Sequence, residues 1–600
     1  MKKLLTIFAA ALLSLSAAAE KYSAELEAKA AGGDAKAQFW MGLSLHNGDG
    51  VARDDARAFM WMEKSAAAGN ASAMNWMGYF CENGIGTDAD LDKAIEYYRS
   101  AADNDDNSAM CTLGVKYFNG DGVERDRIKA FRLFDRAANK DNNTARQWLG
   151  HCYEHGYGCP GSYSMALKWY HIGANRLHKG CTEARDALID RLKKIADNDP
   201  EAAEGLATAF AQGWCDVNQK SDYLAFRYWR IAAEGGRSES KTNLGEFYYC
   251  GKGTDTDYGE ALRWFRSAAA DGEATAMYCL GLMYVNGEGT APDPAEGARW
   301  YTRAAGLGNR YAMNNLGVLY MQGNGVERDL LKAIDCYEKA KAAGNNVAGE
   351  NLTALVQRLM SRQSDHHERA VAGYMFVAAK ETKKGLKMLE KASQNEPKAF
   401  GYLASLWYTG IFMEPDYNKC VHYARQGAER GDIMSHLIMG TLYYHGKGVP
   451  VEYRKAAEHW SAAAAGGDVE SIYNLSVLYC EGTGVDKNPA KALELLNDAI
   501  DRGSIQALVS LAALSYNGDG IPRDYPLAFK LMQRCIHLRA SISKEEYSEI
   551  ARNLSACYRF GRGTEPNEEL ADYWMEISAL TGNTDAAGVR SMFGISTKIL

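Results

Sequence analysis

Residues able to do covalent chemistry are few in this chain. A serine three residues before a lysine can act as an acylating nucleophile whose proton the lysine takes. This spacing occurs at Ser238 with Lys241 and at Ser541 with Lys544. The Ser-Asp-Asn and Lys-Thr-Gly segments that accompany the motif in serine enzymes are absent, and chance alone gives two such matches in a chain of this length. We therefore predict no catalytic residues.

Metal and phosphate chemistry find little support either. The sequence has no His-Glu-x-x-His segment and no regular Cys/His spacing that argues for a zinc site. His366, His367 and Glu368 form an isolated cluster, which we expect to be solvated surface in a polar linker at residues 361–369. The recurring Gly-x-Gly segments join helix to helix and lack the strand that precedes a phosphate-binding loop. We predict no metal site and no cofactor.

Those glycines instead mark a repeat with a period of 36 residues. The regular copies begin their loops at Gly48, Gly84, Gly120 and Gly156, at Gly251, Gly287 and Gly323, and at Gly446, Gly482 and Gly518. Irregular copies occur at Gly213, Gly410 and Gly561. A period of this length indicates stacked supersecondary units.

Each copy predicts two helices. Around Gly120, the residues Leu113, Gly114 and Tyr117 represent three columns before the loop: a leucine or methionine, a small residue and, in most copies, a tyrosine. Their spacing places the leucine and tyrosine on one helical stripe, and the small residue beside it lets a second helix approach closely. Six residues after the loop glycine, Asp126 represents a column of Asp, Asn and Ser that favours the start of the second helix.

The full pattern, Ala-x-x-x-Leu-Gly-x-x-Tyr-x-x-Gly-x-Gly-Val followed by Asp, Ala, Trp and Ala-Ala, resembles the Sel-one-like repeat family, a relative of tetratricopeptide repeats. Residues 312–326 and 276–289 follow it closely. With the period, the resemblance implies an all-α fold, a right-handed α-solenoid of about fourteen stacked helical hairpins. It says little about activity, because repeat arrays bind many kinds of partner.

The first nineteen residues form a separate segment. Lys2 and Lys3 precede an apolar run, and three alanines end at Ala19 before Glu20, as in a secretory signal peptide. The run is too short to span a membrane, and nothing later reaches that length. We expect cleavage after Ala19 and a periplasmic or secreted protein without stable membrane insertion.

The net charge bears on the kind of partner, and the cysteine positions bear on whether disulfides form. Removing Lys2 and Lys3 takes the formal net charge from −8 to −10, which argues against a nucleic-acid partner. A cysteine-rich bacterial subfamily of these repeats joins each hairpin by a disulfide at a fixed spacing. Ten of the thirteen cysteines here occupy columns that depart from that pattern: Cys81, Cys111, Cys152, Cys250, Cys279, Cys336, Cys420, Cys480, Cys535 and Cys557. We expect most of them to be buried thiols, with Cys152 and Cys159 the pair most worth testing.

The spacing of the copies divides the chain. The segments predicted are a signal peptide (1–19), a capping helix (20–33), repeat block one (34–178), an inserted helix (179–200), repeat block two (201–344), a degenerate repeat with a polar break (345–395), repeat block three (396–580) and a tail or cap (581–600). We expect the irregular steps to separate three rigid blocks.

By analogy with tetratricopeptide repeats, the first helices should line a concave groove at positions eight and five before the loop glycine. The residues there include Trp40, Trp76, Trp148, Tyr79, His151, Asn243, Glu246, Asn315, Asn474 and Asn553. The tryptophans either pack between hairpins or form an aromatic groove for an extended peptide, with an amide-lined groove later in the chain. The sequence leaves both interpretations open.

The function most consistent with these features is a non-enzymatic exported scaffold that binds a protein or peptide through its concave face. The alternatives are a β-lactam-hydrolysing or peptidoglycan-binding repeat protein, or a secreted effector. Association with the cell wall or envelope also stays open.

Overall fold

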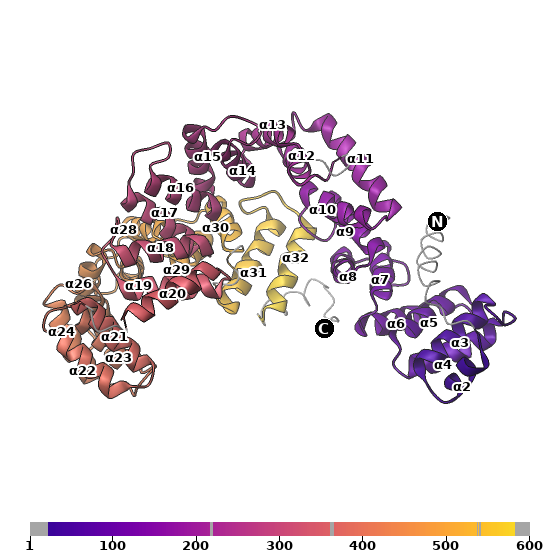
Figure 1. The fold of residues 1–600 in the computed structure, drawn as a ribbon, viewed down its shortest axis with the longest axis horizontal. Helices are drawn as coiled ribbons and strands as arrows, with labels where there is room; N and C mark the ends of the chain where they lie inside the picture. The colour runs from indigo at the N-terminus through magenta and orange to yellow at the C-terminus, as the bar shows by residue number, and fades with distance from the viewer. Residues whose placement is uncertain (1–21, 216–219, 360–364, 537, 539–541, 583–600) are drawn as a thin grey trace. The chain divides into compact units, whose positions relative to one another are not determined.

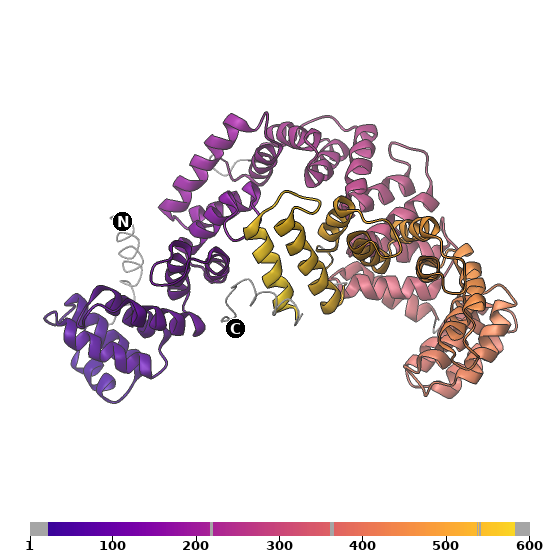
Figure 2. The ribbon, with the colours of Figure 1, turned by 180° about the vertical axis from the view of Figure 1, so that it is seen from behind.

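The computed structural model describes residues 22–215, 220–359, 365–536, 538 and 542–582. The predicted signal peptide and nearly all of the predicted C-terminal tail lie outside these residues. The described chain is an α-solenoid whose helices follow one another as antiparallel hairpins (Figure 1; Figure 2). It divides into two compact units, 1–237 and 238–600.

Five hairpins form the first unit. They are α3 (Ala35–Asn47) with α4 (Asp55–Ala67), α5 (Ala71–Asn83) with α6 (Leu91–Asp103), α7 (Asn107–Asn119) with α8 (Arg127–Asn139), α9 (Asn143–His155) with α10 (Tyr163–Asn175), and α12 (Pro200–Gln212) with α13 (Asp222–Glu234). Two single helices complete this unit: α2 (Ala24–Ala31) precedes the first hairpin, and α11 (Lys179–Ile195) lies between α10 and α12.

Nine hairpins form the second unit. They are α14 (Ser238–Cys250) with α15 (Tyr258–Asp271), α16 (Ala274–Asn286) with α17 (Pro294–Gly306), α18 (Arg310–Gln322) with α19 (Leu330–Ala342), α21 (His366–Ala378) with α22 (Thr382–Ala392), α23 (Lys398–Thr409) with α24 (Tyr417–Ala428), α25 (Ile433–His445) with α26 (Tyr453–Ala465), α27 (Val469–Glu481) with α28 (Pro489–Asp501), α29 (Ile505–Asn517) with α30 (Tyr525–Ile536), and α31 (Lys544–Phe560) with α32 (Glu568–Leu580). One single helix, α20 (Asn346–Leu359), lies between α19 and α21. The fourteen hairpins in the described residues match the number predicted from the period.

Two residues that recur in the loop of each regular copy, the helix cap and the second glycine, have clear structural roles. Asp126 caps α8 by accepting a hydrogen bond from the Lys129 N–H at 2.9 Å. The second loop glycine packs on the preceding hairpin: Gly289 has a φ of +71°, and an ideal Cβ there would lie 2.6 Å from the Tyr258 carbonyl oxygen. Only glycine combines that backbone conformation with so close an approach.

The boundary between the two compact units is set by the packing of α12, and the three rigid blocks stay a prediction. The boundary falls between Arg237 and Ser238, inside predicted repeat block two. The α12–α13 hairpin stays with the first unit because α12 packs against both α10 and α11. The inserted helix α11 therefore packs against the hairpins on either side of it.

The prediction of a solvated polar linker around His366 was wrong. α21 begins at His366, so the cluster occupies the first turn of a helix, capped by Asp365. Glu368 is only 3% exposed, and its Oε1 accepts from Arg328 at 2.6 Å and from Arg358 at 2.7 Å. α21 packs against α22 as the paired helices of the repeats do. The buried charge of Glu368 is tolerated because two arginines pair with it.

All thirteen cysteines lie in the described residues, and none of them forms a disulfide there. Eleven are buried, including Cys152 and Cys159. Burial raises the pKa of the Cys111 thiol to about 12, so it behaves as a small apolar side chain. Among the described helices, none is both long and apolar enough to cross a membrane.

Candidate functional site

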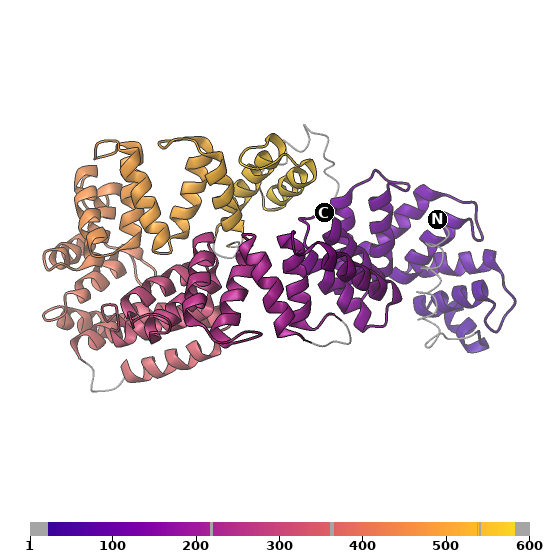
Figure 3. The ribbon, with the colours of Figure 1, turned by 90° about the horizontal axis from the view of Figure 1, so that it is seen from above.

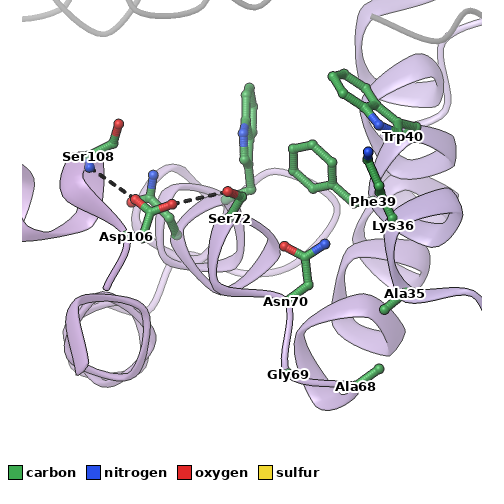
Figure 4. Close-up of a pocket in the computed structure, with 12 residues that line it drawn as sticks. Ala35, Lys36, Phe39, Trp40, Ala68, Gly69, Asn70, Ser72, Asp106 and Ser108 are labelled. Carbon is green, nitrogen blue, oxygen red and sulfur yellow. Dashed lines mark hydrogen bonds between the residues drawn. The ribbon is translucent and has the colours of Figure 1, made fainter. Parts of the chain in front are cut away.

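The first helices of the N-terminal repeats surround a cavity of about 540 Å³. Its walls come from α3, the turn between α4 and α5, α5 itself and the start of α7 (Figure 4). The lining residues are Ala35, Lys36, Phe39, Trp40, Ala68, Gly69, Asn70, Ser72, Asn75, Trp76, Asp106 and Ser108. We call this cavity the aromatic pocket.

Two of the predicted groove residues, Trp40 and Trp76, form part of its wall. They occupy the same column of successive copies, and they are 8% and 6% exposed. Trp40 packs edge-on against Phe39, with ring centroids 5.2 Å apart. Trp76 packs edge-on against Phe80 at 5.9 Å. Both tryptophans belong to the buried apolar cluster of the first hairpins and also line the cavity, so the two sequence interpretations overlap here.

Asn75 is the polar feature of the pocket that has no structural explanation. Its side chain is only 8% exposed, and its Oδ1 has no hydrogen-bond partner among the described residues. A buried acceptor left without a donor costs roughly 1–3 kcal/mol. The same column holds Asn314, which is equally buried but accepts a hydrogen bond from Asn351 Nδ2 at 2.9 Å. The missing donor is thus particular to the copy that lines the pocket.

The rim carries both charges. Asp106 caps α7 by accepting from the N–H groups of Ala109 at 2.8 Å and Ser108 at 3.1 Å, and Ser72 Oγ donates to its other oxygen at 3.1 Å (Figure 4). Burial raises the pKa of the Asp106 carboxyl. Lys36 is exposed and also lines the pocket. A ligand would meet an acceptor-rich edge and a separate cationic group.

Three other predicted residues of the first unit lie outside the pocket wall. The half-buried Tyr79 ring packs against Trp76 at 5.7 Å. Trp148 stacks on Phe134, with centroids 5.5 Å apart and an interplanar angle of 11°. His151 lies beside Trp148 at 5.9 Å. The aromatic column is therefore split between the pocket and a separate cluster on α9.

The predicted residues of the second unit are half-buried or buried: Asn243, Glu246, Asn315, Asn474 and Asn553. The Asn315 Nδ2 donates to the Tyr301 hydroxyl at 3.2 Å, so this amide already has a partner on α17 of the preceding hairpin. Burial raises the pKa of the Glu246 carboxyl. Their role in binding stays a prediction.

One cluster of side chains could hold a metal ion. His151, Glu154 and His155 place one ligand atom each within 4.8 Å of one another on α9. The order His-x-x-Glu-His is the sequence signal for it. However, Glu154 already accepts from the Tyr170 hydroxyl at 2.7 Å and pairs with Arg191 at 3.0 Å. These contacts give the carboxylate a structural role, and we assign no metal to the cluster.

The serine–lysine motif falls on α14, which begins at Ser238. Lys241 Nζ donates to Asp271 at 2.5 Å, so its charge is taken up by a neighbouring helix. Ser541 lies outside the described residues.

Sequence reasoning missed Asn75, Lys36 and Asp106. Lys36 lies four residues before Trp40, one helical turn away, so extending the predicted face toward the start of α3 would have found it. Asp106 is a helix cap that reaches the pocket from the next copy. The unpartnered state of Asn75 depends on neighbouring copies and has no signal in the sequence.

A family model supports this description of the fold. The Sel1 repeat matches thirteen segments, at residues 35–70, 71–106, 107–142, 144–176, 200–236, 238–273, 274–309, 310–345, 401–432, 433–468, 469–504, 505–534 and 549–583. The chain belongs to the Sel1 repeat family. Proteins of this repeat class typically mediate protein interactions as scaffolds.

Solved structures include similar chains. A protective antigen with an SLR fold from uropathogenic Escherichia coli, c5321, is 21% identical over 93% of this chain and 97% of its own, with a TM-score of 0.29. A Sel1 repeat protein from Oxalobacter formigenes is 27% identical over 57% of this chain and 93% of its own, with a TM-score of 0.28. No curated protein matches the sequence. At these TM-scores the likenesses carry no information on function.

Proposed function

We propose that this protein is an exported scaffold whose aromatic pocket binds an extended peptide segment of a partner protein. The observation that carries the proposal is the unpartnered Asn75 Oδ1 in the same cavity as Trp40 and Trp76. The Sel1 repeats support a scaffold function, and the pocket supports the binding site that we propose for it. No catalytic step is part of the proposal.

The chemistry of the pocket suits a peptide. An extended backbone has N–H groups free to donate, and one of them would satisfy Asn75 Oδ1. The indole side chains of Trp40 and Trp76 line the pocket and offer apolar contact, and tryptophan is enriched among the residues that contribute most to binding. An exposed cation, Lys36, suits a carboxylate on the partner. Both a backbone and an apolar side chain would therefore find partners.

Export forms a separate part of the proposal and rests on the first nineteen residues of the sequence. Cell fractionation with N-terminal sequencing should recover a periplasmic or secreted chain that starts at Glu20. Recovery of an unprocessed chain from the cytoplasm would contradict this part alone.

The peptide site is tested by a matched pair of variants. Peptides are first selected from a random displayed library with the mature chain, and their affinities are measured by fluorescence anisotropy. Asn75→Leu removes the free acceptor and should not destabilise the fold, because it replaces an unsatisfied polar group by an apolar one of similar size. Asn314→Leu changes the same column outside the pocket.

We expect Asn75→Leu to lower the affinity for the selected peptides by at least tenfold and Asn314→Leu to leave this affinity unchanged. Equal binding by all three proteins would place the peptide site elsewhere. Failure of the mature chain to select any peptide, together with co-sedimentation on cell-wall sacculi, would replace the proposal by a peptidoglycan-binding function.

A further inference from the structure

A second cavity, of about 420 Å³, lies within the second unit between hairpins that are distant in sequence. Its walls come from α15–α17 on one side and α28–α30 on the other. In Figure 3 the C-terminal hairpins of this unit run back past its earlier ones. Arg303 joins the two sides: its Nε donates to the Asp501 carbonyl oxygen, and its guanidinium pairs with the Asp501 carboxylate at 3.3 Å.

The cavity is basic in an acidic protein. Four cationic side chains line it: Arg266, Arg303, Lys530 and Arg534. The one carboxylate in the wall is Asp501, which Arg303 already engages. The whole chain carries a formal net charge of −8, so this concentration of positive charge is opposite to the average of the protein. A cavity of this sign attracts an anion.

Arg534 supplies the strongest single indication. Its side chain extends from α30 to the end of α15, where an ideal Cβ on Gly272 would lie 2.8 Å from Arg534 Nε. That Nε is buried and has no hydrogen-bond partner among the described residues. Burial lowers the pKa of the guanidinium, which shows that the surroundings disfavour its charge. An anion in the cavity would supply the missing acceptor and would add to the negative charge of Asp501, whose effect on the Arg534 pKa is smaller than that of burial.

The rest of the lining is apolar. It consists of Met277, Trp300, Leu307, Ile500, Ile505, Leu508, Leu511, Leu527 and Leu531, with a few small or amide residues. Inorganic anions leave such a surface uncovered, whereas an anion with a hydrocarbon body would bury it at roughly 25 cal/mol per Å². Cavities of this size hold small ligands.

We propose that this cavity binds a small amphipathic anion, with a carboxylate or phosphate head at Arg534 and an apolar body against the leucines of α29 and α30. The site is separate from the aromatic pocket and does not depend on peptide binding there. A bound anion would contact both α15–α17 and α28–α30, so it would hold these hairpins together.

Isothermal titration of the mature chain with four probes tests the proposal. Octanoate and octyl phosphate carry the two head groups, octanol is the neutral control, and inorganic phosphate is a head group without a body. We expect one or both amphipathic anions to bind at least tenfold more tightly than octanol and than inorganic phosphate. The anion that binds more tightly identifies the preferred head group, and added NaCl should lower its affinity.

Variants locate the site. Arg534→Met should abolish the preference for the anion over octanol, and Arg534→Lys should restore most of it. Arg552→Met is the matched control, since Arg552 also has a buried Nε without a partner but lies outside the cavity, near Glu549. Lys530→Met changes an exposed side chain and should lower the affinity for the anion about threefold. It replaces Arg534→Met in the test if that variant does not fold.

Equal affinity for octanol and both amphipathic anions would overturn the proposal. So would a result in which neither octanoate nor octyl phosphate binds. It would also be overturned if inorganic phosphate bound as tightly as octyl phosphate. Retention of the anion preference in folded Arg534→Met, or in Lys530→Met where that variant replaces it, would exclude this cavity as the site. None of these results bears on the peptide site, which Asn75→Leu tests alone.

Discussion

The ring of Tyr170 lies directly against the backbone of Gly150. An ideal Cβ on Gly150 would be 2.5 Å from Tyr170 Cε1, and the hydroxyl of the same ring donates to Glu154 at 2.7 Å. The two helices of the hairpin, α9 and α10, are thus in contact through a ring on a glycine. The same contact recurs at Gly78 with Tyr98, Gly114 with Phe134, Gly245 with Phe265, Gly281 with Tyr301 and Gly317 with Tyr337.

Gly150→Ala should destabilise the protein despite the better helix propensity of alanine. Propensity alone would favour alanine by up to about 1 kcal/mol, whereas forcing a methyl group against the buried Tyr170 ring costs about 1–3 kcal/mol. Thermal unfolding should show a net loss of stability. Gly349→Ala is the control, because its new Cβ would come no closer than 3.6 Å to Lys341 on α19. That variant should gain stability, and a gain at both sites would refute the packing argument.

The sequence predicted this close approach but not the residue that makes it. The small column beside the leucine stripe indicated a second helix nearby, and the structure confirms it. In this copy the residue at the Trp position of the repeat pattern is Tyr97, three residues after Ala94. The ring that packs on Gly78 is that of the next residue, Tyr98. Two adjacent aromatic residues are about 100° apart on a helix, and a repeat pattern alone does not say which one faces the partner.

Glu368→Gln should be costly because the carboxylate is shared by two arginines. Hydrogen bonds to charged groups are worth about 1.5–3 kcal/mol, and the amide removes the charge that Arg328 and Arg358 both use. We expect a loss of roughly 2 kcal/mol in the free energy of unfolding. Asp365→Asn is the matched control: asparagine keeps the cap of α21, and Asp365 is half-exposed. It should cost less than about 1 kcal/mol. Equal losses would mean that the buried carboxylate has no special role.

The sequence predicted contacts between neighbouring copies but not contacts between copies that are far apart in the chain. Trp40 and Trp76 could be predicted because a column shared by neighbouring copies places them together. Arg534 and Gly272 meet although they are in copies far apart, and a nearest-neighbour repeat gives no register for such a contact. The buried Glu368 was missed because the sequence there departs from the repeat pattern.

Trp76→Ala and Trp148→Ala should differ in cost. Trp76 is 6% exposed between its neighbours, so its removal leaves a cavity and should destabilise the protein by about 3–5 kcal/mol. Trp148 is half-buried and should cost less, although its stacking on Phe134 is lost. Melting curves of the two variants measure this order. A small loss for Trp76→Ala would show that its role is in the pocket and not in the core.

Stability should fall on acidification because of His459. Burial, with His436 close by, lowers the pKa of His459 to about 4, and the two Nδ1 atoms are 3.1 Å apart. The unfolded chain has a histidine pKa of about 6.5, so between these values it binds a proton that the folded protein does not. Stability from this group is complete above pH 6.5 and is lost as the pH falls through 4, at no more than about 1.4 kcal/mol per pH unit.

His459→Phe removes this titration while keeping a ring stacked on Tyr443, from which His459 lies 5.8 Å away. Relative to the unchanged protein, the variant should become progressively more stable as the pH is lowered from 7 to 4.5. Scanning calorimetry over this range measures the difference. The control variant is His422→Gln, which replaces an exposed histidine on α24. Parallel curves for the unchanged protein and His459→Phe would mean that His459 takes up its proton without unfolding, through movement of the His436 side chain.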